Sequence, residues 1–146
     1  MVYKCVLKDD YFKHFIYCFF EEMCNYPDSL IEYQFDYKNR DDFKHQKADE
    51  NFITAWDKYE LVIGNIGKIK FEELSEESKE TMLDFFKTAF YNYINSYYTD
   101  ETEEFVSMDT INNLCEFELL DEIPVSDYIN GNTYYFSPAF KKWLCV

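Results

Sequence analysis

Arginine, glycine and proline are all scarce in this chain, whose 146 residues include three glycines, three prolines and a single arginine, Arg40. The chain also lacks any apolar run of the roughly 18 residues that a membrane-spanning helix needs. Residues 1–10 contain too short an apolar run for a signal peptide. Because 21% of the residues are aromatic, intrinsic disorder is disfavoured as well. We therefore expect one ordered domain over residues 1–146, located in the cytoplasm.

Metal-binding patterns are also missing. The five cysteines include no CxxC pair, and their odd number argues against a disulfide framework. His14 and Cys18 lie one helical turn apart, as two zinc ligands can, but no second pair accompanies them. We therefore expect no metal and no cofactor, and free, mostly buried thiols at Cys5, Cys18, Cys24, Cys115 and Cys145.

Short catalytic motifs are absent too. The chain has no GxSxG nucleophile motif, no glycine-rich phosphate loop and no HExxH zinc motif. Residues 27–34 faintly resemble the core of a restriction-type nuclease, but the catalytic lysine is not at the expected place. Adjacent acids such as Glu72 and Glu73 could bind Mg²⁺, although a solvated charged surface is the commoner role of such pairs. We therefore expect that the protein is not an enzyme.

Positive charge is deficient throughout the chain, with 14 basic against 29 acidic residues and a net charge of −15. No lysine or arginine lies between Lys87 and Lys141. The acids of this cation-free interval are Asp100, Glu101, Glu103, Glu104, Asp109, Glu116, Glu118, Asp121, Glu122 and Asp127. Such a surface repels nucleic acid and anionic membranes, because phosphate binding depends on lysine and arginine. The partner that this charge favours is a basic protein surface, with no direct binding to nucleic acid or to a membrane.

The residue usage gives one indication of origin. The chain is rich in asparagine, lysine, tyrosine, phenylalanine and isoleucine, and poor in alanine, glycine, proline and arginine. This bias is typical of AT-rich genomes, and it suggests a low-GC bacterium, its phage or plasmid, or a large DNA virus. A phage or viral protein of this kind would act in the host cytoplasm.

Three helices are predicted from apolar periodicity. Residues 10–25 carry an apolar stripe, with Asp9 or Asp10 as the cap at its start, and residues 25–28 end this helix. The second helix covers residues 76–98 after a cap at Ser75, and its carboxyl-terminal half is apolar or aromatic nearly all round. Ser107 can cap the third helix, over residues 108–120. We expect the second helix to lie in the centre of the core or to be half covered by a partner.

Strands are predicted from alternation and from turn residues. Residues 29–37 read as a strand, and residues 52–72 as a β-hairpin that turns at residues 64–67. A second hairpin pairs residues 125–129 with 133–136 across Asn130-Gly131. A short helix follows Pro138. The expected fold class is α+β: a single compact domain with an N-terminal helix, a small antiparallel sheet, a long central helix at 76–98, and a C-terminal helix plus β-hairpin.

Two nucleic-acid-binding arrangements are weighed and disfavoured. Residues 63–70 resemble the GxxG loop of KH domains, but that loop joins two helices, whereas this segment lies between predicted strands. A helix at 108–120 followed by a hairpin is the order of a winged helix. The negative charge of the same region argues against DNA contact, so a winged-helix shape here would contact protein.

Three functional hypotheses remain. The first is an acidic antagonist that occupies the nucleic-acid-binding surface of a partner, such as a phage or mobile-element inhibitor of a CRISPR or other defence nuclease. The second is an immunity or antitoxin protein that neutralises a basic toxin. A toxin gene next to this one would distinguish it from the first. The third is an enzyme or small-molecule binder whose site is assembled from distant residues.

The antagonist hypothesis assigns partner binding to the cation-free interval. Spaced carboxylates there would imitate phosphates, and tyrosines would supply anchors, because tyrosine is enriched at binding hot spots. The expected partner-binding residues are Asp100, Glu101, Glu103, Glu104, Glu116, Glu118, Asp121, Glu122, Tyr97 and Tyr98.

Overall fold

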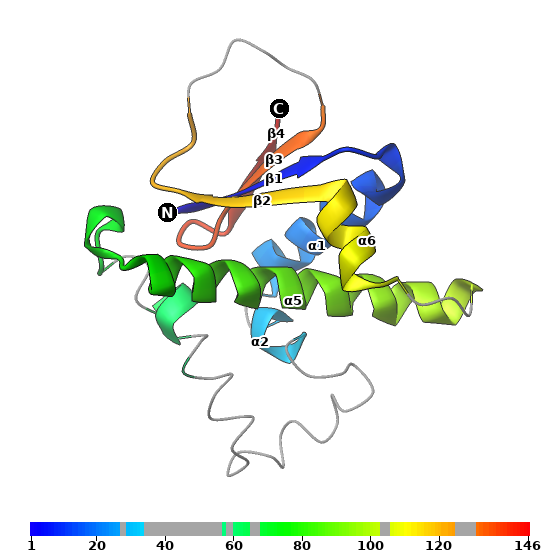
Figure 1. Ribbon diagram of the computed structural model, residues 1–146, viewed down its shortest axis with the longest axis horizontal. Coiled ribbons are helices and arrows are strands. Elements are labelled where there is room, and N and C mark those ends of the chain that lie inside the picture. The colour runs from blue at the N-terminus through cyan, green and yellow to red at the C-terminus, as the bar shows by residue number, and fades with distance from the viewer. Residues whose placement is uncertain (27–28, 34–56, 58–59, 65–67, 103–105, 125–130) are drawn as a thin grey trace.

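The fold is a mixed α+β arrangement, as expected, in which two long helices pack on one four-stranded antiparallel sheet (Figure 1). The computed structural model describes residues 1–26, 29–33, 57, 60–64, 68–102, 106–124 and 131–146. The strands of the sheet are β1 (Val2–Leu7), β2 (Cys115–Leu120), β3 (Thr133–Ser137) and β4 (Lys142–Cys145). They lie in the order β2-β1-β3-β4, and every neighbouring pair is antiparallel. The N-terminal strand is therefore central, with both of its edges paired.

Side chains alternate across β1, as the two faces of a strand require. Tyr3, Cys5 and Leu7 are buried, whereas Lys4 and Val6 between them are half-buried. We call the face of Tyr3 the inner face of the sheet and the face of Lys4 the outer face. No strand is predicted from the sequence over residues 2–7, so β1 is an element that sequence periodicity missed.

Helix α1 (Lys13–Asn25) lies against the inner face of the sheet. A 3₁₀ turn, Asp10–Phe12, precedes it, and the residue at its N-cap is Phe12, which makes no side-chain cap bond. Neither Asp9 nor Asp10 is therefore the N-cap of α1 itself, because the chain enters the helix through the 3₁₀ turn. The predicted apolar stripe and the end at Asn25 are confirmed, and its buried residues are Ile16, Phe19, Phe20 and Met23.

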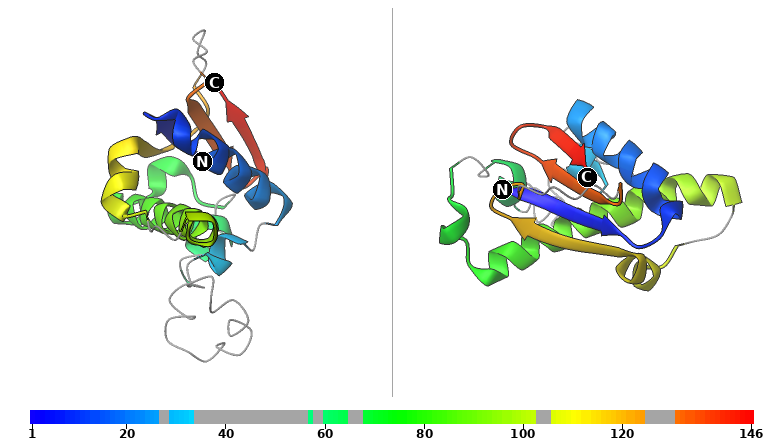
Figure 2. Two further views of the ribbon diagram at one scale, coloured as in Figure 1. Left: turned by 90° about the vertical axis from the view of Figure 1, so that its right-hand side faces the viewer. Right: turned by 90° about the horizontal axis from the view of Figure 1, so that it is seen from above.

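Helix α5 (Glu76–Thr102) is the longest element, and it crosses the inner face beside α1 (Figures 1 and 2). Its predicted cap is confirmed, because the Ser75 Oγ accepts a hydrogen bond of 3.1 Å from the Ser78 N–H. The helix continues to Thr102, beyond the predicted end at residue 98. Its buried residues include Met82, Phe85, Phe86, Ala89, Phe90, Tyr93 and Ile94. The central position of this helix explains why so much of its circumference is apolar.

Aromatic rings form the core between the sheet and the helices. Tyr3 stacks on Phe86, with ring centroids 4.2 Å apart, and Phe136 stacks on Phe20 at 5.4 Å. Phe86 also lies 6.0 Å from Phe136, which links the two stacks. The Tyr3 hydroxyl donates a 3.3 Å hydrogen bond to the Met82 carbonyl. Burial of this kind is the main favourable contribution to folding, since each aromatic side chain removes roughly 150–250 Å² from water.

Two segments predicted as strands are helical in the structure. Residues 29–32 form α2 (Ser29–Glu32) instead of the start of a strand, because Leu30 and Tyr33, three residues apart, are both buried. The predicted hairpin over 52–72 is also wrong where the structure describes it. Glu60–Gly64 is a π-helical turn with Val62 buried, and Phe71–Glu73 is a 3₁₀ turn. The remaining residues of these two predicted segments lie largely outside the described part of the chain.

The predicted third helix is half helix and half strand. Helix α6 (Met108–Leu114) begins as expected at Ser107, whose Oγ accepts from the Thr110 N–H at 3.2 Å. It ends where β2 begins, so the prediction of a helix over residues 115–120 is wrong. The reason is a change of period: Cys115 and Leu119 are buried, while the acids between them face solvent. Pairing with β1 then satisfies the backbone of this segment.

The C-terminal segment forms a hairpin rather than the predicted helix. β3 matches the predicted strand 133–136, but its hairpin partner is β4, formed by the residues that were expected to be helical. The predicted partner, residues 125–129, lies outside the described residues. The turn at 138–141 closes through a bond from the Lys141 N–H to the Pro138 carbonyl, and Lys141 takes a positive φ of 49°. No helix in the described part of the chain is both long and apolar enough to cross a membrane.

Candidate functional site

Acidic side chains cover much of the described surface, and of those whose exposure the structure describes, all except Glu22 are exposed. Two of the segments that carry them lie at one end of the molecule (Figures 1 and 2). One group occupies the amino-terminal turns of α5 and the 3₁₀ turn before it, and the other follows β2. We call this surface the acidic end, and it consists of Glu72, Glu73, Glu76, Glu77, Glu80, Asp121 and Glu122.

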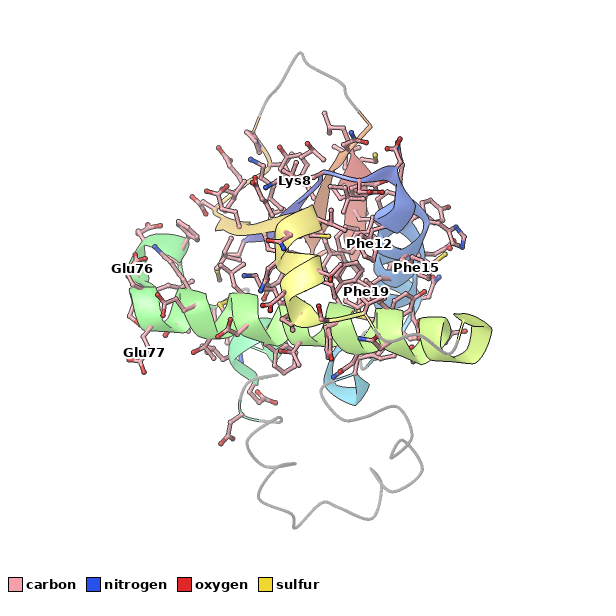
Figure 3. All side chains as sticks on the ribbon, turned by 45° about the vertical axis from the view of Figure 1, so that its right-hand side comes forward. Lys8, Phe12, Phe15, Phe19, Glu76 and Glu77 are labelled. Atoms are coloured by element: carbon pink, nitrogen blue, oxygen red, sulfur yellow. The ribbon has the colours of Figure 1, made fainter. Side chains whose placement is uncertain are left out.

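The local fold holds the first group in place. Figure 3 shows Glu76 and Glu77 at the start of α5, and both side chains are exposed. Their carboxylates are favoured there because the amino end of a helix carries a partial positive charge. Glu80 lies one turn after Glu76, so the group continues along one side of the helix. Among the described residues, Lys79 forms the one ion pair with this group: its Nζ lies 3.1 Å from the Glu76 Oε1 and 4.5 Å from the ring centroid of Phe71. Lys70 precedes the 3₁₀ turn and donates its backbone N–H to the Glu73 Oε2 at 3.4 Å.

The acids of β2 differ, because one lysine in β1 and one directly after it pair with them on the outer face. The Lys8 Nζ lies 2.7 Å from Glu116, and the Lys4 Nζ lies 3.7 Å from Glu118. A side-chain hydrogen bond from Lys8 and the charge of Lys8 lower the pKa of Glu116. An open hollow of about 330 Å³ lies beside these pairs, lined by Lys4, Val6, Glu116, Phe117 and Glu118. The acids of β2 are thus partly neutralised, although no cation stands near them in the sequence.

The expected partner-binding residues are distributed over several parts of the fold. Asp121 and Glu122 are exposed at the acidic end, whereas Glu116 and Glu118 belong to the ion-paired outer face. Tyr97, Tyr98, Asp100 and Glu101 lie in the last turns of α5, at the opposite end of that helix from its acidic first turns. Glu103 and Glu104 lie outside the described residues.

Sequence reasoning missed the acids of α5 and of the turn before it. The available signal was the spacing of Glu76, Glu80 and Asp84, which repeats every four residues and keeps the carboxylates on one side of a helix. These acids lie outside the cation-free interval, because Lys79 and Lys87 interrupt them in the sequence. What the sequence could not provide is the meeting of α5 with the end of β2, which depends on the tertiary fold.

Among the described residues, one cysteine and one histidine side chain lie close together. The Cys18 Sγ lies 3.6 Å from the His14 Nε2, and all five cysteines are free thiols. Burial is the main cause that raises the pKa of Cys18, and the charge of Glu21 adds to it. In the described residues, no three side chains of histidine, cysteine, aspartate and glutamate come together in a way that could hold a metal ion.

Comparison with known proteins adds no relative to these observations: no family model, no curated protein and no solved structure matches the chain.

Proposed function

We propose that this protein is an antagonist that binds the basic, nucleic-acid-binding surface of a partner through its acidic end. A phage or mobile-element inhibitor of a CRISPR or other defence nuclease is the kind of protein that fits. The observation that supports this proposal most directly is the composition of the acidic end. Its carboxylates come from two separate segments, and among the described residues Lys79 is the one cation that forms an ion pair with them, while Lys68 and Lys70 precede the 3₁₀ turn.

The physical basis is competition for a surface that normally holds phosphates. A nucleic-acid-binding groove presents lysines and arginines at phosphate spacing. Exposed carboxylates on a rigid helix can pair with those cations without paying the entropy of ordering a loop. Long-range attraction between a −15 protein and a basic groove also accelerates association. Affinity should therefore fall about tenfold or more from low to high salt, because the Debye length shrinks from about 10 Å at 0.1 M to about 3 Å at 1 M.

The test starts with capture of partners from a lysate of the source cells on immobilised wild-type protein, followed by mass spectrometry. We expect nucleic-acid-binding proteins that are released by salt. The affinity of the captured partner is then measured for two double variants with the same change in net charge. Glu80→Lys with Glu122→Lys alters the acidic end, while the matched control, Glu21→Lys with Asp109→Lys, alters exposed acids on α1 and α6. The first variant should lose at least about tenfold in affinity, and the control should lose much less.

A third double variant with the same change in net charge, Glu101→Lys with Glu104→Lys, tests the acids expected from the sequence. A larger loss here than at the acidic end would move the binding surface to the far end of α5. Equal losses in all three variants would show that only net charge matters, which contradicts a defined surface. A captured partner that binds equally well at all salt concentrations would contradict the proposal altogether.

A further inference from the structure

The free edge of β4 presents a regular set of backbone groups. Thr133 and Val146 exchange both of their backbone hydrogen bonds, at 3.1 Å and 2.7 Å, so this residue pair sets the alternation along the hairpin. Leu144 and Lys142 then bond to β3, whereas Trp143 and Cys145 direct their N–H and C=O groups away from it. No described strand pairs with this second edge of β4. Four backbone groups therefore point outward on either side of Leu144.

The surroundings of this edge are unusual for so acidic a protein. Residues 128–146 contain no aspartate or glutamate, and they carry Lys141 and Lys142. The opposite edge of the sheet, β2, carries Glu116 and Glu118 and leads to the acidic end. Edge strands are commonly protected by charged side chains that prevent pairing with another chain. Within β4, Lys142 is the one charged side chain. The next side chain on the same face of the sheet is Leu144, which is 48% exposed.

We infer that β4 pairs antiparallel with β4 of a second copy of the chain, about a two-fold axis at Leu144. In this register Trp143 and Cys145 bond to Cys145 and Trp143 of the second copy, which uses all four outward backbone groups. If the axis lay at Trp143, Cys145 would instead have to accept a hydrogen bond from the Lys141 N–H of the second copy. That N–H is already donated to the Pro138 carbonyl. With the axis at Leu144, all four outward backbone groups are hydrogen-bonded. A two-fold contact is also self-complementary, because the same residues meet from both copies.

The side chains around the axis fit this arrangement. Leu144 would face Leu144 of the second copy in a pair without backbone bonds, in which Cα atoms lie about 4.5 Å apart and side chains are in contact. On the inner face, Tyr17 stands edge-on to Trp143 with ring centroids 4.9 Å apart and is 45% exposed, so it extends the apolar surface onto α1. Glu21 follows Tyr17 by one helical turn and is the acid on α1 nearest to it in sequence.

Salt distinguishes this contact from the proposed partner binding. Two copies of charge −15 repel each other, and salt weakens that repulsion. Dimerisation should therefore strengthen as salt is added, whereas binding to a basic partner should weaken. Dimerisation is also measured on the isolated protein, without a partner. The absence of a dimer would therefore not contradict the proposed function, and failure to bind a basic partner would not contradict the dimer.

Sedimentation equilibrium of the full chain tests the inference, from about 1 µM to about 1 mM in low and high NaCl. We expect a monomer–dimer equilibrium whose dissociation constant falls as NaCl rises. Leu144→Lys places two like charges at the axis and should raise the dissociation constant by at least about tenfold. The matched control is Phe140→Lys, which changes a side chain that is 77% exposed in the turn before β4. It should leave the constant nearly unchanged, and circular dichroism should show both variants folded.

A second measurement does not depend on the loss of an interaction. Leu144→Cys places two thiols opposite each other at the axis, and diamide oxidises them to a disulfide between two copies. Phe140→Cys and the wild type serve as controls, because the native thiols are the same in all three. We expect a covalent dimer from Leu144→Cys well above the amount in either control. A wild-type protein that stays monomeric at every concentration and salt, or equal cross-linking of Phe140→Cys and Leu144→Cys, would overturn the inference.

Discussion

The two faces of the sheet are built from different interactions. On the inner face, Tyr3 and Phe136 pack on aromatic rings of α5 and α1 and are almost fully buried. On the outer face, Lys4 and Lys8 form exposed ion pairs with the acids of β2. Burial of apolar area stabilises a fold strongly, whereas an exposed ion pair contributes little because water and salt screen it. The inner face therefore holds the fold together, and the ion pairs of the outer face add little to its stability.

The largest difference in stability between the two faces is expected from Phe86→Ala, which removes a ring from the inner face. This ring is fully buried and meets Tyr3, Phe19 and Phe136, so its removal leaves a cavity that the rigid sheet cannot close. Loss of about 3–5 kcal/mol of unfolding free energy is expected. Leu144→Ala, on the exposed side of β4, should cost less than about 0.5 kcal/mol in the monomer. Urea unfolding at low protein concentration measures both, and similar losses would show that the core is not where the structure places it.

The second largest effect is expected from alkaline pH, which should lower the free energy of unfolding through groups buried on the inner face. Burial raises the pKa of Tyr3 and of Cys5 in the folded protein, while an unfolded tyrosine ionises near its ordinary value of 10.0 and an unfolded thiol near 9.0. Because the folded pKa lies above the unfolded one, these groups stabilise the fold below the unfolded pKa, and that contribution is lost as pH rises above it. Each group then costs about 1.4 kcal/mol per pH unit.

Tyr3→Phe isolates the contribution of the tyrosine. Its unfolding free energy should fall less steeply than that of the wild type above pH 10, by about 1.4 kcal/mol per unit. The control is Tyr26→Phe, which removes a hydroxyl from a side chain that is 67% exposed and should leave the slope unchanged. Urea titrations between pH 7 and 11 in the presence of a reducing agent provide the measurement. Parallel curves for the wild type and Tyr3→Phe would contradict the buried position of Tyr3.

Long helices were the part of the fold that the sequence predicted best. The apolar stripes of α1 and α5 repeat over several turns, so their period is unambiguous, and the caps or stops at Ser75 and Asn25 mark their ends. Short elements were predicted poorly. Four residues of α2 and four of β4 contain too little repetition to separate a helix from a strand, and tertiary packing decided both.

Strand β1 shows most clearly what local patterns cannot reveal. Tyr3, Cys5 and Leu7 do alternate with less buried residues, but the run is short and carries no turn signal. Its role follows from pairing with β2 and β3, which lie more than a hundred residues away in the sequence. The same distance explains the charge error. A cation-free interval in the sequence is not a cation-free surface, because Lys4 and Lys8 approach Glu118 and Glu116 through that pairing.

The smallest effect is expected where these ion pairs are broken. Lys8→Ala removes the charge and the hydrogen bond that lower the pKa of Glu116, so that pKa should rise toward the ordinary carboxyl value. Since the folded pKa lies below the unfolded one, any stability from the pair exists above the ordinary carboxyl pKa and is lost as pH falls through the folded value. At neutral pH the unfolding midpoint should not move measurably, because both side chains are largely exposed. NMR titration of the Glu116 carboxyl follows the pKa and urea unfolding follows the stability. A large drop in stability with an unchanged pKa would mean that Lys8 supports the fold by packing, and that the outer face matters as much as the inner one.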